Sequence, residues 1–376
     1  MVTIPAEHPL PAADLLPATH PLQSGLTADS RLITAYRGTR PDVTPVWFMR
    51  QAGRSLPEYR DLRVGTAMLD ACLDPAMSSE ITLQPVRRHG VDAAIFFSDI
   101  VVPLKQAGVA VEIVPGRGPV MGEAVRTSAQ VDALTAIDPS ILDETLAPVS
   151  EGVALTVAGL REIGDGRTPL IGFAGAPFTL AAYLVEGGPS KDHLAARTLM
   201  HADPEAWAKL MAWTADITGR FLRAQILAGA SAAQLFDSWA GALSLEDYER
   251  YVAPASARAL SHVADLPVPK VHFGVGTGEL LGAMHGIGAD VVGIDYRLGL
   301  DEGIRRLGGN VPVQGNIDPA LLAAPWNVLE AHVLDVLERG KAAPSHVLNL
   351  GHGVPPETDP TVLTRIVSLV HEWDWR

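Results

Sequence analysis

The stretch Pro45-Val-Trp-Phe-Met-Arg-Gln-Ala-Gly-Arg54 joins a short apolar run to a basic turn that contains glycine. The apolar run, residues 46–49, is too short for a buried helix, and a proline precedes it. These features predict a buried β-strand that ends where the arginines begin.

Two arginines mark this strand end. Arg50 and Arg54 lie four positions apart, so both side chains face the same side if the chain coils there. Guanidinium is planar, permanently charged and rich in N–H donors, so converging arginines suit a ligand with several carboxylates or phosphates. The alternative is a solvated basic turn paired with Glu58 and Asp61, and spacing alone does not choose between the two.

The same pattern, an apolar run that stops at a polar or glycine-rich loop, recurs along the chain. Segments of helical periodicity separate the runs, for example at 75–88, 143–163, 204–228 and 245–264. Eight strands that alternate with helices predict a (β/α)8 TIM barrel of the α/β class, with a doubly wound open sheet as the alternative. The predicted strands cover 46–49, 93–97, 169–173, 232–236, 270–273, 291–294, 311–314 and 347–350.

Candidate functional residues follow the ends of five of these predicted strands. A barrel gathers the carboxyl ends of its strands at one face, where the active sites of this fold lie, whereas an open sheet would scatter the same side chains. Their positions therefore favour the barrel. The five residues are Arg50, Asp99, Tyr183, Ser238 and His352.

Two segments lie outside the barrel pattern. A hairpin-bearing insertion is expected after the second strand, from β-like runs at 111–114 and 119–121 around a glycine-rich turn. Residues 1–29 are low in charge and rich in proline, so we expect them to be disordered. Residues 30–376 then form a single barrel domain, although the length alone would also allow two domains.

Composition limits the function. With 47% hydrophobic and 19% charged residues, the 376-residue chain is able to bury a large core. Its net charge of −14 argues against broad binding to nucleic acid or to anionic membranes, whose phosphates it would repel. An acidic protein that binds a polyanion must therefore concentrate its positive charge in one place. The turn that contains Arg50 and Arg54, the arginine turn, is such a place.

Cysteine content and the N-terminus favour a cytoplasmic protein. Cys72 is the only cysteine, which excludes an internal disulfide and a thiolate-rich metal site. The N-terminus lacks the pattern of a signal peptide. The glycine series Gly274-Val-Gly-Thr-Gly278 is not a dinucleotide-binding fingerprint, because Glu279 occupies the place of the third glycine.

Five stretches of the chain carry a resemblance to a known family. They are Met49-Arg-Gln-Ala-Gly-Arg54 with Leu56-Pro-Glu-Tyr-Arg60, Phe96-Phe-Ser-Asp-Ile100, Gly172-Phe-Ala-Gly-Ala-Pro-Phe-Thr-Leu180 with Tyr183, Phe236-Asp-Ser-Trp-Ala-Gly241 and Leu350-Gly-His-Gly353. In this order they resemble the uroporphyrinogen decarboxylases, which convert four acetate side chains of a tetrapyrrole to methyl groups. The resemblance runs from about residue 45 to the C-terminus and implies that reaction, as part of heme biosynthesis, without a metal or an organic cofactor.

The resemblance also implies roles for single residues. Asp99, Arg50 and Arg54 are the expected catalytic residues, with the arginines holding substrate carboxylates and one of them helping to deliver a proton through water. Arg63 matches a further arginine, and Gln51 and Ala52 are expected to offer backbone N–H groups. The implied substrate-binding set is Arg50, Gln51, Ala52, Arg54, Arg63, Asp99, Tyr183, Ser238 and His352.

Asp99 has a structural alternative. It follows two phenylalanines, which places a carboxylate at the mouth of an apolar barrel, where desolvation raises the pKa. Nearby arginines and hydrogen-bond donors are expected to keep it ionised, so that it accepts the pyrrole N–H groups and stabilises a protonated pyrrole. Without the resemblance, a cap on the next helix is the first interpretation. Likewise, Tyr183 also suits an ordinary helix position, Ser238 a helix cap and His352 a loop.

Two rival functions can be compared with the residues of the chain. A zinc-dependent methyltransferase of the same superfamily needs a His-x-Cys pair, but His272-Phe-Gly274 has no thiol and Cys72 is distant in sequence. A non-catalytic tetrapyrrole carrier would need the arginines but not Asp99. The expected partners are therefore uroporphyrinogen and, by resemblance, a second copy of the chain in a homodimer, with neither nucleic acid nor membrane.

Overall fold

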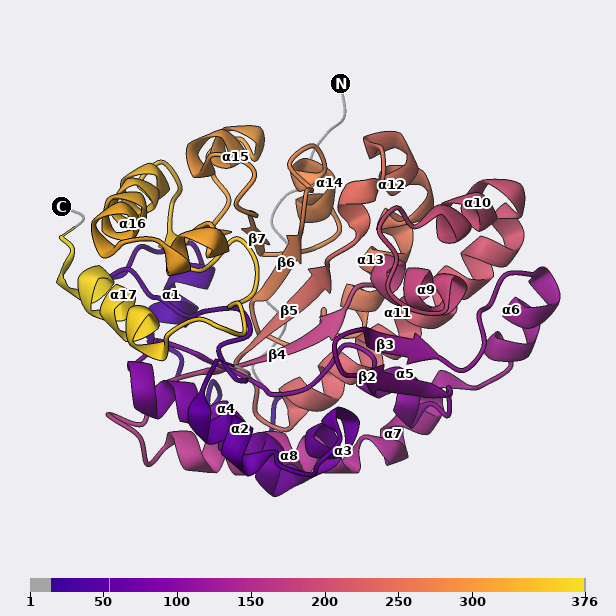
Figure 1. Ribbon diagram of the computed structural model, residues 1–376, viewed down its shortest axis with the longest axis horizontal. Coiled ribbons are helices and arrows are strands. Elements are labelled where there is room, and N and C mark those ends of the chain that lie inside the picture. The colour runs from indigo at the N-terminus through magenta and orange to yellow at the C-terminus, as the bar shows by residue number, and fades with distance from the viewer. Residues whose placement is uncertain (1–14, 54, 375–376) are drawn as a thin grey trace.

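The structure is a computed structural model that describes residues 15–53 and 55–374. Within these residues, seven parallel strands form one sheet in the order β1-β4-β5-β6-β7-β8-β9. Figure 1 shows helices surrounding the strands. The strands of this sheet are β1 (Ala94–Ile95), β4 (Leu170–Gly175), β5 (Ala232–Asp237), β6 (Lys270–Gly274), β7 (Val291–Gly293), β8 (Val313–Gln314) and β9 (His346–Val347).

The segment 45–49 closes the sheet into a barrel. On one side Leu348 N–H donates to Pro45 O and Trp47 N–H donates to Leu348 O, next to β9. On the other side Asp92 N–H donates to Val46 O, next to β1. The first predicted strand is thus present as a single parallel bridge between Val46 and Leu348, and the prediction of a (β/α)8 barrel is confirmed.

Asp92 holds this closing segment at the opposite end of the barrel from the arginine turn. One carboxylate oxygen, Oδ2, accepts hydrogen bonds from Val46 N–H at 2.9 Å and from His371 Nε2 at 2.8 Å. His371 belongs to the last helix, α17 (Pro360–Glu372). The Asp92 carboxylate therefore joins three parts of the structure, which are the first strand segment, the start of β1 and the C-terminal helix.

The other helices follow the predicted order, with two of the predicted long helices divided. The segment 143–163 breaks at Leu146 before Pro148, and the segment 245–264 breaks at Val252 before Pro254, because proline lacks the N–H that would continue a helix. The helices besides α17 are α1 (Arg31–Tyr36), α2 (Pro57–Leu62), α3 (Met68–Leu73), α4 (Pro75–His89), α5 (Val102–Gln106), α6 (Ser128–Thr135), α7 (Leu142–Thr145), α8 (Ala147–Leu160), α9 (Pro177–Glu186), α10 (Leu194–Ala202), α11 (Pro204–Leu227), α12 (Leu245–Tyr251), α13 (Ala253–Ser261), α14 (Leu281–Gly286), α15 (Leu300–Arg306), α16 (Trp326–Gly340) and the short 3-10 helices η2 (Pro139–Ile141), η3 (Ala240–Ala242) and η4 (Pro319–Ala323).

The expected insertion after the second barrel strand is present. β2 (Val111–Val114) and β3 (Gly118–Met121) pair antiparallel, as the two short runs and the glycine-rich turn predict. The hairpin is tied to the helix after β4, because Met121 N–H donates to Gly187 O.

Residues 15–29, part of the segment expected to be disordered, make long-range contacts with the rest of the chain. His20 is buried, and its Nε2 lies 3.0 Å from Ile226 O and 3.2 Å from Ala230 O. The Thr27 hydroxyl lies 2.8 Å from the Ser231 hydroxyl. These contacts with the end of α11 and the segment between α11 and β5 are long-range, so the proline-rich composition of residues 1–29 does not reveal them. The rest of the predicted disordered segment, residues 1–14, lies outside the described residues.

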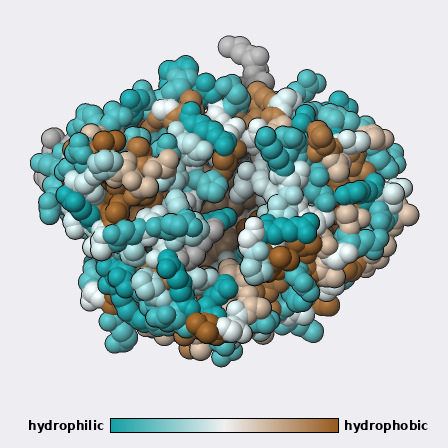
Figure 2. Space-filling view, in the orientation of Figure 1, coloured by the Kyte–Doolittle hydropathy of each residue, from teal (hydrophilic) through white to brown (hydrophobic). Residues whose placement is uncertain are grey.

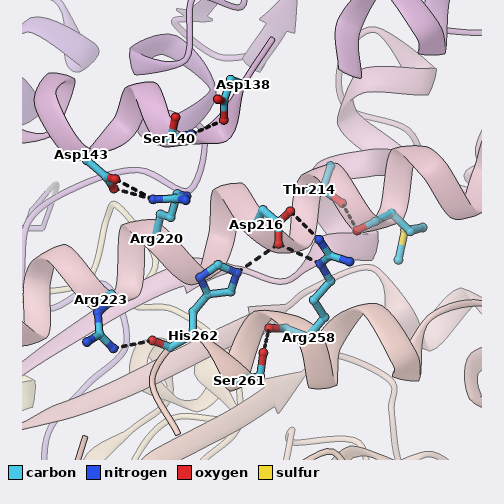
Figure 3. A network of polar contacts seen from close by, with 11 residues as sticks. Asp138, Ser140, Asp143, Thr214, Asp216, Arg220, Arg223, Arg258, Ser261 and His262 are labelled. Atoms are coloured by element: carbon cyan, nitrogen blue, oxygen red, sulfur yellow. Dashed lines mark hydrogen bonds and ion pairs between the residues drawn. The ribbon is translucent and has the colours of Figure 1, made fainter. Parts of the chain in front are cut away.

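Ion pairs fasten the outer helix layer. Asp216 on α11 accepts two hydrogen bonds of 2.8 Å from the guanidinium of Arg258 on α13 and one of 3.0 Å from His262 Nε2 (Figure 3). Arg258 and His262 act against the effect of burial and hold the pKa of Asp216 below its ordinary value. None of the helices in the described parts of the chain is long and apolar enough to cross a membrane.

Candidate active site

The arginine turn is a strained turn held from both sides. Arg50 has a φ of 64°, a left-handed conformation that costs a non-glycine residue on the order of 1 to 3 kcal/mol. Gln51 N–H donates to Phe48 O, which closes the turn. Met49 N–H donates to the Asn349 side chain at 2.9 Å, and Val354 N–H donates to Met49 O. The loop after β9 therefore fixes where Arg50 leaves the barrel.

Gly353 allows the Arg50 side chain to lie against that loop. A Cβ at Gly353 would sit 2.4 Å from Arg50 Cδ, so only glycine leaves room for the side chain in this position. His352, the preceding residue, is half-buried. Burial, Arg50 and Arg297 together lower the pKa of His352. The imidazole is therefore disposed to be neutral near pH 7, with one ring nitrogen that donates a hydrogen bond and one that accepts.

Asp99 lies two residues after the core phenylalanines at the end of β1. Its Oδ1 accepts a hydrogen bond of 3.1 Å from Val101 N–H, ahead of α5, so the turn contact expected of a structural aspartate is also present. Burial raises the pKa of Asp99, and the Val101 N–H and the charge of Arg50 offset only part of this effect. The sequence-based expectation is that hydrogen-bond donors and arginines outweigh the desolvation of Asp99. In the structure desolvation has the larger effect on its pKa.

Tyr183 extends from α9 into the same region. Its ring lies 3.9 Å from the ring of Trp239, whose other neighbour is His193, stacked at 4.3 Å. Burial first, and then the charge of Asp99, raise the pKa of Tyr183 to about 12, while Arg50 acts in the opposite direction. The phenol is thus protonated at neutral pH and able to donate a hydrogen bond.

Ser238 follows β5 directly, in the turn after the strand, and is half-buried. Phe236, two residues earlier, makes edge contacts with Phe173 and Phe273 of the neighbouring strands. Asp237 points the other way, is fully buried, and accepts a hydrogen bond of 3.0 Å from the Thr179 hydroxyl. That contact joins the end of β5 to α9, the helix that carries Tyr183.

The structure gives different results for the four remaining residues of the predicted substrate-binding set, which are Gln51, Ala52, Arg54 and Arg63. Gln51 is buried, its side chain bonds Phe48 N–H and Ala93 O, and its own N–H is used in the turn, contrary to the expectation that it is offered to substrate. Arg63 donates to the Tyr59 hydroxyl at 2.8 Å and lies over the Tyr59 ring. Ala52 is half-buried and its N–H stays a prediction. Arg54 lies outside the described residues.

Electrostatics connect four of the predicted residues. The charge of Arg50 lowers the pKa of Asp99, of Tyr183 and of His352. These residues come from the segments after the first strand, β1, β4 and β9. The molecular surface is hollowed near its centre, over the ends of β4 and β5 in the orientation of Figure 1 (Figure 2). The arrangement offers a cation, a carboxylate, a phenol and an imidazole to one ligand.

Two residues of this region were not singled out from the sequence. Trp239 stands in the quoted stretch Phe236–Gly241, and its stacking with Tyr183 depends on a contact that no local pattern predicts. Arg297 follows β7 as Arg50 follows the first strand, so the same strand-end criterion would have found it.

The residues proposed for zinc in the rival methyltransferase are separated. His272 is fully buried, and its Nε2 lies 3.6 Å from Asp237 Oδ2. The charged groups that act on buried Cys72 are Asp99 and Arg63 instead. Within residues 15–53 and 55–374, no three His, Cys, Asp or Glu side chains gather as a metal site requires.

Comparisons with known proteins agree with this geometry. A family model described as uroporphyrinogen decarboxylase (URO-D) matches residues 27–373. Proteins named uroporphyrinogen decarboxylase are 71% identical over 375 residues in Leifsonia xyli subsp. xyli and 69% identical over 347 residues in an Arthrobacter species. The matches cover 95% and 92% of this chain, and 98% of each relative.

A solved structure of a methyltransferase from Methanosarcina mazei is similar with a TM-score of 0.75, covering 92% of this chain and 98% of the other. At 17% identity it supports the fold and carries no conclusion about activity. The family model, by contrast, spans nearly the whole chain, and the stretches that form the arginine turn and the Asp99 loop lie within it. The chain therefore belongs to the uroporphyrinogen decarboxylase family.

Proposed function

We propose that this protein is a carboxy-lyase that converts uroporphyrinogen III to coproporphyrinogen III by removing the carboxyl groups of its four acetate side chains. The observation that supports the proposal is that the charge of Arg50 lowers the pKa of Asp99, Tyr183 and His352, which follow the ends of β1, β4 and β9. The substrate carries many carboxylates and four pyrrole N–H donors, and this set of groups complements both.

The chemistry needs an electron sink for the bond that breaks. Adding a proton to a pyrrole ring carbon creates a cation, and the electrons of the C–CO₂⁻ bond then flow into the ring as CO₂ leaves. The resulting exocyclic methylene takes up a proton to become methyl, and the ring returns its first proton. The net change is one proton taken up and one CO₂ released for each acetate, without oxidation or reduction.

Asp99 is the residue assigned to the charged intermediate. As a carboxylate it accepts hydrogen bonds from the pyrrole N–H groups and stabilises the ring cation while it forms. Its raised pKa reflects a partly desolvated position without substrate, where a negative charge is stabilised less by water and interacts more strongly with a nearby cation. Binding of four N–H donors would lower that pKa again.

The remaining groups are assigned to positioning and proton delivery. Arg50 and Arg54 hold substrate carboxylates, and one of them helps to deliver the ring proton through water. Tyr183, Ser238 and His352 hydrogen-bond acetate or propionate groups, and the Ala52 N–H is offered to substrate. Arg63, which donates to the Tyr59 hydroxyl, belongs to the proposed substrate-binding set.

Two substitutions at Asp99 test the catalytic role against the structural one. Asp99→Asn keeps an oxygen that accepts from Val101 N–H but removes the charge, whereas Asp99→Glu keeps the charge and displaces it. We expect kcat of Asp99→Asn to fall by roughly a hundredfold or more with a smaller change in KM, and Asp99→Glu to retain more activity. The assay follows loss of carboxyl groups from uroporphyrinogen under anaerobic conditions.

The opposite order of the two variants would refute this assignment. A structural cap functions nearly as well with Asn as with Asp and worse with Glu. Thermal melts of both variants exclude misfolding as the cause of lost activity. If the unaltered protein itself released no carboxyl groups, the proposed function would be wrong.

Three further properties are proposed with the function. Turnover without a metal or organic cofactor predicts activity after exhaustive chelation, and restoration of lost activity by zinc would contradict it. The second property is a homodimer, in which a partner covers the loops of an open barrel. Sedimentation at micromolar concentration should then show a dimer, and a result of monomer alone would contradict the proposal. A cytoplasmic location predicts activity in the cytoplasmic fraction of lysed cells.

A further inference from the structure

Arg297 lies at the same end of the barrel as the proposed active site. It stands four residues after the end of β7, behind Asp295 and Tyr296. A Cβ at Gly351 would lie 2.2 Å from Tyr296 N, so the backbone after β7 is in direct contact with the backbone that leads to His352. Arg297 and His352 therefore flank one contact between two barrel loops.

The guanidinium of Arg297 is held in place but is not fully neutralised. Its Nη1 lies 3.8 Å from Asp295 Oδ2, beyond hydrogen-bond distance, and that same oxygen accepts a hydrogen bond of 2.7 Å from Gly276 N–H. The guanidinium lies 5.4 Å from the centre of the Tyr296 ring, and Nη1 lies close over Gly276. The side chain remains 55% exposed. These contacts orient the cation, and within residues 15–53 and 55–374 no hydrogen bond uses the donors of its guanidinium.

The contacts of Arg297 lie with the loops after β6 and β7, at Gly276 and Tyr296. The charge of Arg297 lowers the pKa of His352, whereas the arginine that acts on Asp99 and Tyr183 is Arg50. A cation at this place reaches the periphery of a macrocycle centred on Asp99, where the longer propionate arms extend, and not the acetate undergoing reaction.

We propose that Arg297 binds a propionate carboxylate of the tetrapyrrole and so sets affinity for substrate, intermediates and product alike. The inference rests on the proposed function for the identity of the ligand. Because propionates are kept through all four decarboxylations, the contact is the same in the ground state and in the transition state of each round. An interaction of this kind changes KM and leaves kcat unchanged.

The test compares Arg297→Gln and Arg297→Lys with a matched control, Arg305→Gln. Arg305 is also an exposed arginine, but it pairs with Glu302 along α15. For Arg297→Gln we expect KM for uroporphyrinogen, and the inhibition constant of the product coproporphyrinogen, to rise by roughly five- to tenfold, with kcat within twofold of the unaltered protein. Arg297→Lys recovers part of the loss, and Arg305→Gln changes neither constant.

Coproporphyrinogen separates the possible ligands of Arg297, because it retains propionates and no acetates. If Arg297→Gln weakened uroporphyrinogen but not coproporphyrinogen, Arg297 would bind an acetate and the proposal would be wrong. Unchanged constants for both, or a fall in kcat with KM unchanged, would overturn it as well. If the protein proves inactive, equilibrium binding of the two compounds supplies the same comparison. Failure of the proposed function would then appear as absent turnover. Failure of this inference would appear in the affinities of Arg297→Gln for the two compounds.

Discussion

Gly353→Ala tests whether the position of Arg50 controls activity. The added methyl group would sit 2.4 Å from Arg50 Cδ and 2.8 Å from Cγ, whereas ordinary contact begins at 3.4 Å. The arginine stem must therefore retreat by about 1 Å, and a misplacement of this size costs on the order of a hundredfold in rate. The backbone of Gly353 does not have a positive φ, so alanine fits the fold.

The assay for this variant is kcat/KM with uroporphyrinogen, combined with a thermal melt. Gly282→Ala is the control, because a Cβ there meets open space. Arg50→Ala removes the clash, so adding Gly353→Ala to it should cost nothing more, which is the non-additivity expected of two residues in contact. If Gly353→Ala retained near-normal kcat/KM, or if the two changes were additive, Arg50 would not act from the position described.

Two further predictions concern stability and the aromatic stack. Burial lowers the pKa of His89 and of His346 to about 4, so between pH 6.5 and 4 the unfolded chain binds more protons than the folded one, and stability should fall with falling pH by up to roughly 1.4 kcal/mol per pH unit for each histidine. Urea unfolding at pH 7, 6 and 5 measures this loss, and equal stability at pH 7 and pH 5 would contradict it. Trp239→Leu frees the Tyr183 ring and should lower kcat/KM by about tenfold, with Trp239→Phe less affected. A loss that exceeded the effect of Tyr183→Phe would mean that Trp239 acts through something other than Tyr183.

Most of the fold could be predicted because the barrel strands are buried apolar runs that end at polar loops. Strands at β4, β5, β6 and the hairpin agree with prediction to within two residues at each end. The first strand is reduced to one bridge at Val46, because the chain turns sharply at Arg50 and the Met49 N–H bonds a side chain. The order of residues 15–29 depends on contacts about 200 positions away, such as His20 with Ile226, which local composition does not report.

The sequence singles out candidate site residues where they follow strand ends. In the structure the charge of Arg50 lowers the pKa of Asp99, Tyr183 and His352, and the roles of these residues stay a prediction. The expectation for Gln51 is wrong because its N–H closes the four-residue turn from Phe48 to Gln51, which the sequence does not specify. Arg297 lay within reach of the same strand-end criterion, but its environment depends on the packing of two loops.

The closure of the barrel has a consequence for how the protein is made. The bond between Met49 and the Asn349 side chain joins residues 300 positions apart, and the C-terminal helix is fastened to the same segment through Asp92 and His371. During synthesis the arginine turn therefore waits for the last strand and loop to emerge before it acquires its neighbours. Contacts of such long range form late and slowly, so a nascent or prematurely ended chain would hold most of its helices and strands while Arg50 still lacked its neighbours.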